Sequence, residues 1–117
     1  MLEIRVSVAD GCAVIGVHGA MRRGPSNDHL IEVVELLCES GERHVALHTA
    51  GVSAVDIDGL VTLMDCHTLM DAAGGCLLVK APSSALRLAL RRTGLDSLLT
   101  IVDEPEIDPS RRSGSAT

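Results

Sequence analysis

Two aspartates at the start of a predicted helix are the residues best placed to carry a function. Asp56 and Asp58 follow the mostly apolar segment 52–55, and Gly59 comes directly after them. The start of a helix presents unpaired N–H groups and a partial positive charge, so carboxylates are stabilised there. The simplest interpretation makes Asp56 an N-cap and Asp58 a partner of the helix dipole. The functional interpretation is that this helix start receives a phosphate or a partner carboxylate, with Gly59 allowing another backbone to approach closely.

The polar residues around this point do not predict catalysis. His48, Ser53 and Asp56 could act as base, nucleophile and orienting acid, but no G-x-S-x-G motif accompanies them. The sequence also lacks G-x-x-x-x-G-K-[ST] and G-x-G-x-x-G, so nucleotide hydrolysis and dinucleotide binding have no phosphate-binding loop. We therefore predict that the protein is not an enzyme and has no catalytic residues.

Cysteine and histidine spacing does not predict a metal site. The residues concerned are Cys12, Cys38, Cys66, Cys76, His18, His29, His44, His48 and His67. Consecutive cysteines are 26, 28 and 10 residues apart, and no C-x-x-C motif occurs. We expect no metal and no cofactor, and cysteines that are buried as small apolar groups, with a redox switch between two of them as the alternative. His67 is expected to be a hydrogen-bonded imidazole in the core.

Composition excludes several classes of partner. The chain has 117 residues, a net charge of −6 and no Phe, Tyr or Trp. Without aromatic rings it cannot stack a nucleobase or a flavin, and the negative charge disfavours nucleic-acid binding. Its uncharged runs are shorter than a membrane span, and no export signal is evident at the start of the sequence. We expect one cytoplasmic domain that binds neither nucleic acid nor membrane, with the oligomeric state left open.

Hydrophobic periodicity predicts an α/β fold with the order β-β-α-β-α-β-α-β. The expected strands cover 2–8, 12–17, 45–49, 76–79 and 98–102, and the expected helices begin near Ser26 or Asn27, near Asp56 and at Pro82-Ser83. Asp10-Gly11 predicts an antiparallel hairpin, whereas the later alternation of strands and helices requires parallel pairing. The result is a mixed, mostly parallel sheet with helices covering one face or one edge.

Segments between these elements complete the prediction. Residues 19–25 are expected to form a loop and 51–55 a connector, and the apolar run 76–79 predicts a strand covered on both faces. Residues 104–117 are acidic, contain Pro and Ser and lack a hydrophobic pattern, so we expect a disordered tail beyond a domain of residues 1–103.

Several motifs together resemble the STAS domain family. The segments that carry the resemblance are 45–47, 51–52, 55–60, 74–79, Leu88 and 92–96. The most specific are the D-x-x-G-L step at 56–60 and the T-G-L-D sequence at 93–96. Over roughly residues 2–103 the chain is most similar to bacterial anti-sigma factor antagonists.

This resemblance implies a sheet covered on one side by helices and a regulatory function. Members bind an anti-sigma factor of the GHKL kinase type, which releases a sigma factor, and the kinase reverses this by phosphorylating the serine of D-S-x-G. Here Ile57 occupies the serine position and has no hydroxyl. Asp58 carries one negative charge, compared with nearly two on phosphoserine. The segment 19–23 and His48 also differ from the family, which often has acidic residues at corresponding positions.

We therefore predict an antagonist that binds its anti-sigma factor without a phosphorylation switch. The alternatives are that Asp58 mimics the phosphorylated state, or that the protein is a STAS-type adaptor or scaffold subunit in a stress-signalling or transport assembly. Ser53 and Thr62 are the remaining candidates for modification. The expected partner-binding residues are Arg22, Arg23, Ser53, Asp56, Ile57, Asp58, Gly59 and Leu60.

Overall fold

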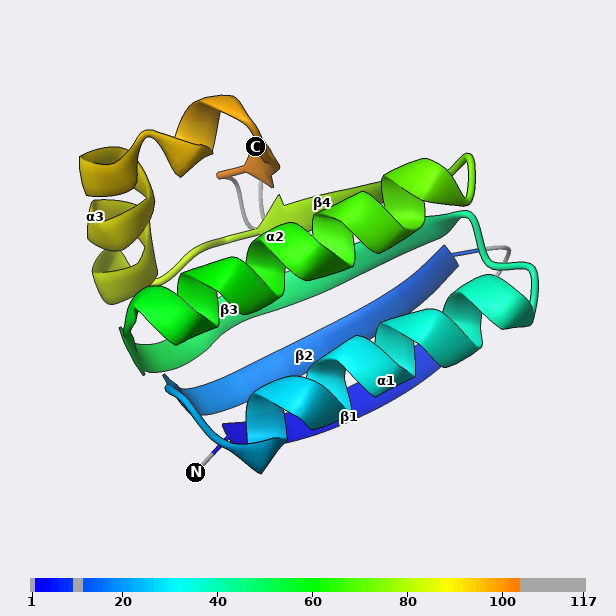
Figure 1. Ribbon diagram of the computed structural model, residues 1–117, viewed down its shortest axis with the longest axis horizontal. Helices are drawn as coiled ribbons and strands as arrows, with labels where there is room; N and C mark the ends of the chain where they lie inside the picture. The colour runs from blue at the N-terminus through cyan, green and yellow to red at the C-terminus, as the bar shows by residue number, and fades with distance from the viewer. Residues whose placement is uncertain (1, 10–11, 104–117) are drawn as a thin grey trace, which may run out of the picture.

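The computed structural model describes residues 2–9 and 12–103, which form one five-stranded mixed sheet with helices (Figure 1). The elements in chain order are β1 (Leu2–Ala9), β2 (Cys12–Met21), α1 (Pro25–Glu39), β3 (His44–Val55), α2 (Ile57–Ala72), β4 (Cys76–Lys80), α3 (Ser84–Thr93), the 3₁₀ helix η1 (Leu95–Ser97) and β5 (Thr100–Val102). The sheet order is β1-β2-β3-β4-β5, with β1 antiparallel to β2 and the other neighbours parallel. The predicted α/β class and element order are confirmed. The predicted turn at Asp10-Gly11 and the predicted tail lie outside the described residues.

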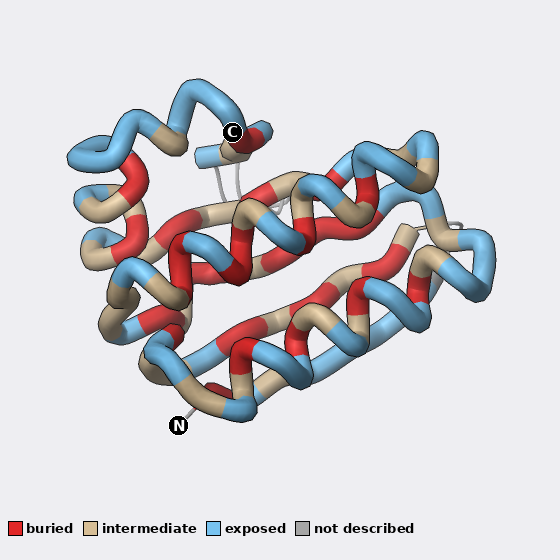
Figure 2. Tube along the Cα trace, in the orientation of Figure 1, coloured by how far each residue is buried: buried red, intermediate tan, exposed pale blue. Residues whose placement is uncertain are grey.

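Helices α1 and α2 lie side by side across one face of the sheet, while α3 packs against β3 near one end of the molecule (Figure 1). On β2, Ile15 and Val17 are fully buried, and the helices contribute the buried Leu30, Leu63 and Met70 (Figure 2). Burying one such side chain stabilises a fold by about 1.5–3 kcal/mol. A core of aliphatic side chains therefore forms here without a single aromatic ring.

Strands β2 and β3 extend further than the sequence predicts. The expected connector 51–55 belongs to β3, so that prediction was wrong. The expected loop 19–25 is shorter than predicted and covers residues 22–24, because β2 continues to Met21 and α1 begins at Pro25. Two register shifts interrupt their pairing, and such bulges break the alternation of inward and outward side chains on which strand prediction depends. The extension ends with Met21 paired to Val55, which brings the end of β2 to the start of α2.

Two element boundaries also differ from the prediction. Helix α1 begins at Pro25, and its N-cap is Gly24 with a φ of 146°, so neither Ser26 nor Asn27 is the cap. Proline suits the first position of a helix, and glycine tolerates a positive φ. The predicted strand 98–102 is shortened to β5, because η1 precedes it.

Strands β1 and β4 are less buried than the sequence predicts. The period-two pattern of β1 predicts a buried face, but Val6 and Val8 are 44% and 53% exposed, and only Leu2 is fully part of the core. In β4, Cys76 is exposed and Leu78 is half-buried, so the strand alternates instead of being covered on both faces. The helices therefore cover one face of the sheet and leave part of the edge strand open.

Cysteine burial is only partly as expected. Cys66 is buried, and burial raises the pKa of its thiol to about 12, which makes it a poor nucleophile. Cys12 and Cys38 are half-buried and Cys76 is exposed, so the prediction of buried cysteines is confirmed for Cys66 alone. The Nδ1 atom of His67 is buried without a hydrogen-bond partner among the described residues, so the predicted hydrogen bond is wrong for this nitrogen.

Candidate functional site

Asp56 fastens the start of α2 to the end of β2. Its Oδ1 atom accepts a hydrogen bond from the backbone N–H of Gly59 at 2.9 Å, which is the predicted N-cap. Its Oδ2 atom accepts a second hydrogen bond, from the backbone N–H of Arg23 at 3.2 Å. The backbone N–H of Asp56 donates to the Met21 carbonyl oxygen at 3.1 Å. One side chain thus fixes the loop after β2 relative to the helix.

These contacts lower the pKa of Asp56. The hydrogen bond from Gly59 has the largest effect, and the hydrogen bond from Arg23 and the charge of Arg22 act in the same direction, although partial burial opposes them. A carboxyl whose pKa is lower in the folded protein than in the unfolded chain stabilises the fold above its unfolded pKa. That stabilisation is lost as the pH falls through the folded pKa.

We expect Asp56→Ala to lower the melting temperature at neutral pH, with a deficit that shrinks as the pH falls below the ordinary carboxyl value of 3.8. Thermal denaturation followed by circular dichroism from pH about 7 to pH about 3 would measure this. Asp56→Asn is the matched control, because an amide oxygen can still cap the helix without the charge. A deficit that is the same at every pH would contradict the assignment of a charged cap.

Gly59 lies beneath the site surface, and Leu60 contributes to that surface only as part of the floor of a groove between α2 and α3. Both residues are buried. A Cβ atom on Gly59 would overlap the Met21 carbonyl oxygen and lie 2.8 Å from Val55 Cγ2. The close approach of another backbone, which the sequence predicts at Gly59, is made by the protein's own β2.

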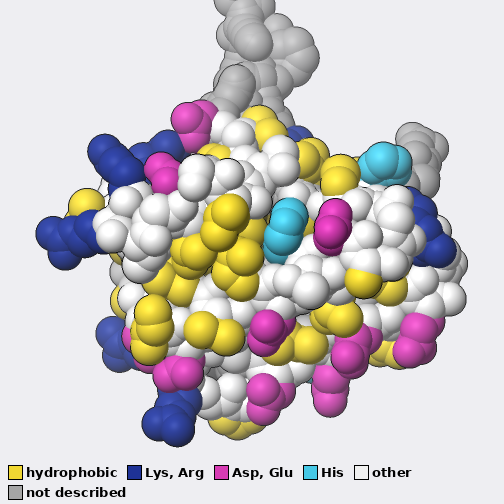
Figure 3. Space-filling view, turned by 45° about the horizontal axis from the view of Figure 1, so that its top comes forward, with side chains coloured by type: hydrophobic (Ala, Val, Ile, Leu, Met, Phe, Trp, Pro, Cys, Tyr) yellow, Lys and Arg dark blue, Asp and Glu magenta, His cyan; other side chains and the backbone are white. Residues whose placement is uncertain are grey.

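The exposed surface at the start of α2 is apolar. Ile57 and Val61, one turn apart, are 64% and 51% exposed, and Leu88 of α3 is 46% exposed. Between α2 and α3 lies a groove of about 450 Å³, which we call the α2–α3 groove. Its lining includes Val55, Ile57, Leu60, Leu88, Ala89 and Arg92. A space-filling view shows hydrophobic side chains gathered on one face of the protein (Figure 3).

Of the other predicted site residues, Ser53 lines the α2–α3 groove, whereas Arg22, Arg23 and Asp58 do not. Arg22, Arg23 and Ser53 are exposed, and Asp58 is half-buried. Thr62 is buried, and its hydroxyl donates a hydrogen bond to the Asp58 carbonyl oxygen at 2.9 Å, so it is a poor candidate for modification. The structure thus leaves Ser53 as the accessible hydroxyl of the two.

The structure does not bring His48 and Ser53 together. His48 and Ser53 are five residues apart along the same strand, which corresponds to about 16 Å in an extended chain and is too far for a base and a nucleophile. No group of His, Cys, Asp or Glu in residues 2–9 and 12–103 could hold a metal ion.

Leu88, Arg92 and Val61 are functional candidates that sequence analysis missed. Leu86 and Leu90 form the buried apolar side of α3, and Leu88 lies outside it. A leucine among the arginines on the exposed side of the helix was therefore the available signal of a contact surface. Ile57 and Val61 were a similar signal, because they lie four residues apart on one side of α2. Joining the two signals required knowing that α3 packs near the start of α2.

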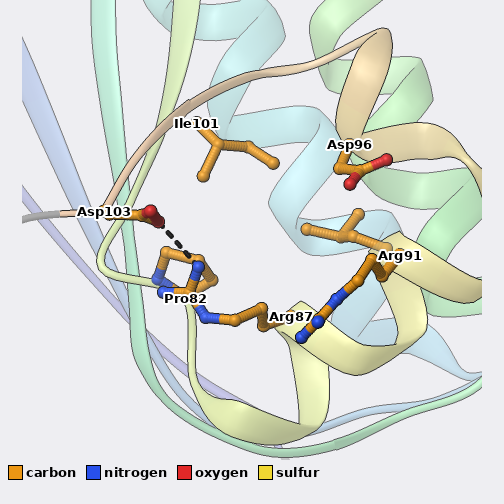
Figure 4. A pocket seen from close by; sticks show the side chains of 7 residues that line it. Pro82, Arg87, Arg91, Asp96, Ile101 and Asp103 are labelled. Atoms are coloured by element: carbon orange, nitrogen blue, oxygen red, sulfur yellow. Dashed lines mark hydrogen bonds and ion pairs between the residues drawn. The ribbon is translucent and has the colours of Figure 1, made fainter.

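A separate cavity of about 360 Å³ lies between α3 and the end of β5 (Figure 4). Arg87 and Asp103 form an ion pair of 2.7 Å at its edge, and Arg91, Asp96 and Ile101 also line it. None of these residues lines the α2–α3 groove. The cavity is therefore separate from the candidate site.

The mixed sheet with helices on one face defines a small α/β domain. The exposed apolar side chains at the start of α2 give this domain a surface suited to contact with another protein. The STAS domain model matches residues 3–109, and the chain belongs to this family. This confirms the resemblance inferred from the sequence. No described helix has the length and apolar character needed to cross a membrane.

Solved structures show the same fold. An anti-sigma factor antagonist from Mycobacterium paratuberculosis has a TM-score of 0.76 at 19% identity, covering 97% of this chain and 93% of that one. The Bacillus cell fate determinant SpoIIAA in its phosphorylated form has a TM-score of 0.68 at 12% identity, covering 98% and 100%. The unphosphorylated anti-sigma factor antagonist SpoIIAA has a TM-score of 0.67 at 10% identity, covering 97% of each chain. Comparison with curated protein sequences finds no significant match.

Proposed function

We propose that the protein is an anti-sigma factor antagonist that binds an anti-sigma factor of the GHKL kinase type and so releases a sigma factor. Membership of the STAS family and a fold shared with anti-sigma factor antagonists support this regulatory function. The two proteins would meet in the cytoplasm, and no catalytic step by this chain is involved.

The observation that carries the proposal is the exposure of Ile57 at the first position of α2. In the family pattern a phosphorylated serine stands here, and 64% of the Ile57 residue surface is open to solvent. An exposed aliphatic side chain beside an apolar groove gains free energy when a partner covers it. The same side chain cannot accept a phosphoryl group. Binding is therefore not gated at this position.

Asp58 does not replace the missing switch. It is half-buried in the first turn of α2 and carries a single charge, whereas a phosphoserine carries nearly two and offers three acceptor oxygens. Because a carboxylate in the first turn also favours the helix dipole, Asp58 has a sufficient structural reason to be there. This favours a competent binder over a protein fixed in an inactive, phosphorylated-like state.

The test combines binding with phosphorylation. We expect isothermal titration to detect binding of the wild-type chain to an anti-sigma kinase from the same organism, and intact-mass analysis after incubation with ATP to detect no added phosphate. Ile57→Ser should bind up to about tenfold more weakly than wild type, because it loses the apolar contact. It should gain one phosphate, because the hydroxyl is restored at the start of the helix.

Asp58→Ser is the matched control, since it places a hydroxyl one position further along. It should bind within about threefold and stay unmodified. Phosphate on Ser53 of the wild type, with loss of binding, would show that a switch exists elsewhere on the surface. A pull-down from the native host is the test of the adaptor alternative. Recovery of transporter subunits in place of an anti-sigma factor would favour that alternative.

A further inference from the structure

A third hollow, of about 590 Å³, lies between the start of α1 and the first half of α2, and we call it the α1–α2 cleft. Three carboxylates line it, from Asp28 on α1 and from Asp58 and Asp65 on α2. Arg23 is the one basic residue in the lining. Within residues 2–9 and 12–103, none of the three aspartates forms an ion pair. The cleft therefore has an uncompensated negative charge.

Asn27 adds an unused hydrogen-bond acceptor to this cleft. The residue is only 5% exposed, yet it lines the cleft, and its side-chain oxygen is buried with no donor among the described residues. A buried polar atom without a partner is unfavourable, and native structures seldom leave one. The neighbouring Thr62 hydroxyl is already used, because it donates to the Asp58 carbonyl oxygen. Because this oxygen is closed to solvent in the free protein, a donor in the cleft would satisfy it once the Asn27 side chain turns toward the cleft.

The spacing of the acceptors favours an organic cation over a metal ion. No set of carboxylates in the described part of the chain converges closely enough to hold a metal. A guanidinium group spreads its charge over a plane with five N–H donors, so it can reach separated acceptors, whereas an ammonium group is a compact point charge. Ile31 and Val61 also line the cleft and could pack against the aliphatic part of such a side chain.

We propose that the α1–α2 cleft binds an arginine side chain of a partner protein. The assignment of that arginine to the anti-sigma factor rests on the proposed function, whereas the recognition of arginine rests on the cleft alone. Asp58 directly follows Ile57, and Val61 lines both the cleft and the hollow next to Ile57. A partner that covers Ile57 would therefore reach the cleft, and acidic side chains are visible beside the hydrophobic ones in Figure 3.

The test is an NMR titration of the full ¹⁵N-labelled chain with N-acetyl-arginine methylamide. We expect saturable shifts of the Asn27 carboxamide signals and of the Asp58 and Asp65 amides, with a Kd of the order of millimolar. N-acetyl-citrulline methylamide has the same shape without the charge and should bind at least about fivefold more weakly. Equal binding of the two compounds, or no saturable shift, would overturn the proposal. Stronger, saturable shifts of the same signals by magnesium chloride would overturn it in favour of a metal site.

Variants that change the charge of the cleft should change the affinity for arginine in opposite directions. Asp65→Asn should weaken arginine binding about threefold, while Arg23→Ala should strengthen it about twofold by removing a like charge. Asp71→Asn, at the far end of α2 and outside the cleft, should change nothing. If an anti-sigma factor binds the wild type and Asp65→Asn equally, the assignment of the arginine to the anti-sigma factor fails and the proposed function stands. If the arginine compound binds but no anti-sigma factor does, the cleft stands and the proposed function fails.

Discussion

Ile57→Asp is expected to weaken binding of the anti-sigma factor by about 100-fold or more. The substitution removes an apolar side chain that is 64% exposed in the free protein and would be covered in the complex. It also places a carboxylate between Asp56 and Asp58, and covering that charge without a partner is costly. Because acidic residues are favourable in the first turn of a helix, the fold itself should not suffer. Isothermal titration measures the effect.

Leu36→Asp is the matched control for this experiment. Leu36 is 61% exposed on α1, so the same change of chemistry is made at an exposed helical site outside the α2–α3 groove. Its binding should stay within about twofold of wild type. Equal losses in both variants would point to a general effect of added charge, and undiminished binding by Ile57→Asp would remove the α2–α3 groove from the interface.

The parts of this structure that sequence analysis predicted correctly depend on local relations. The Asp56 cap joins residues three positions apart, so its signal is contained in a single helical turn. The order of strands and helices follows from hydrophobic periods that can be read within each segment. Both predictions were confirmed because they required no knowledge of what lies opposite in the fold.

The parts that sequence analysis missed depend on distant residues. The extension of β2 and β3 is hidden by register shifts that only pairing reveals. Gly59 faces the carbonyl oxygen of Met21, far away in the chain, so its role could not be separated from that of an ordinary helix glycine. The unpartnered oxygen of Asn27 is likewise invisible until α1 and α2 are placed together. These residues shape the surroundings of the candidate site, which is why the fold was easier to predict than the surface.

Gly59→Val is expected to lower the free energy of unfolding by about 3 kcal/mol or more. In an ordinary helix the loss of a glycine is favourable, by about 1 kcal/mol when alanine replaces it. At this position the added Cβ would overlap the Met21 carbonyl oxygen and lie 2.9 Å from Met21 Cβ. Since a strand backbone cannot move aside as a flexible side chain can, α2 would have to shift away from β2. Urea denaturation followed by circular dichroism measures the change.

Gly16→Val provides the control, because a Cβ at Gly16 would meet nothing within 4 Å and valine suits a strand. Its stability should lie within about 0.5 kcal/mol of wild type. A Gly59→Val protein as stable as wild type would contradict the packing of α2 on β2. The comparison also decides how loss of binding should be interpreted. A Gly59 variant that binds poorly reports an altered fold. Ile57→Asp, in contrast, alters the contact surface while the fold keeps its stability. Ile57 is therefore the residue that tests the interface directly.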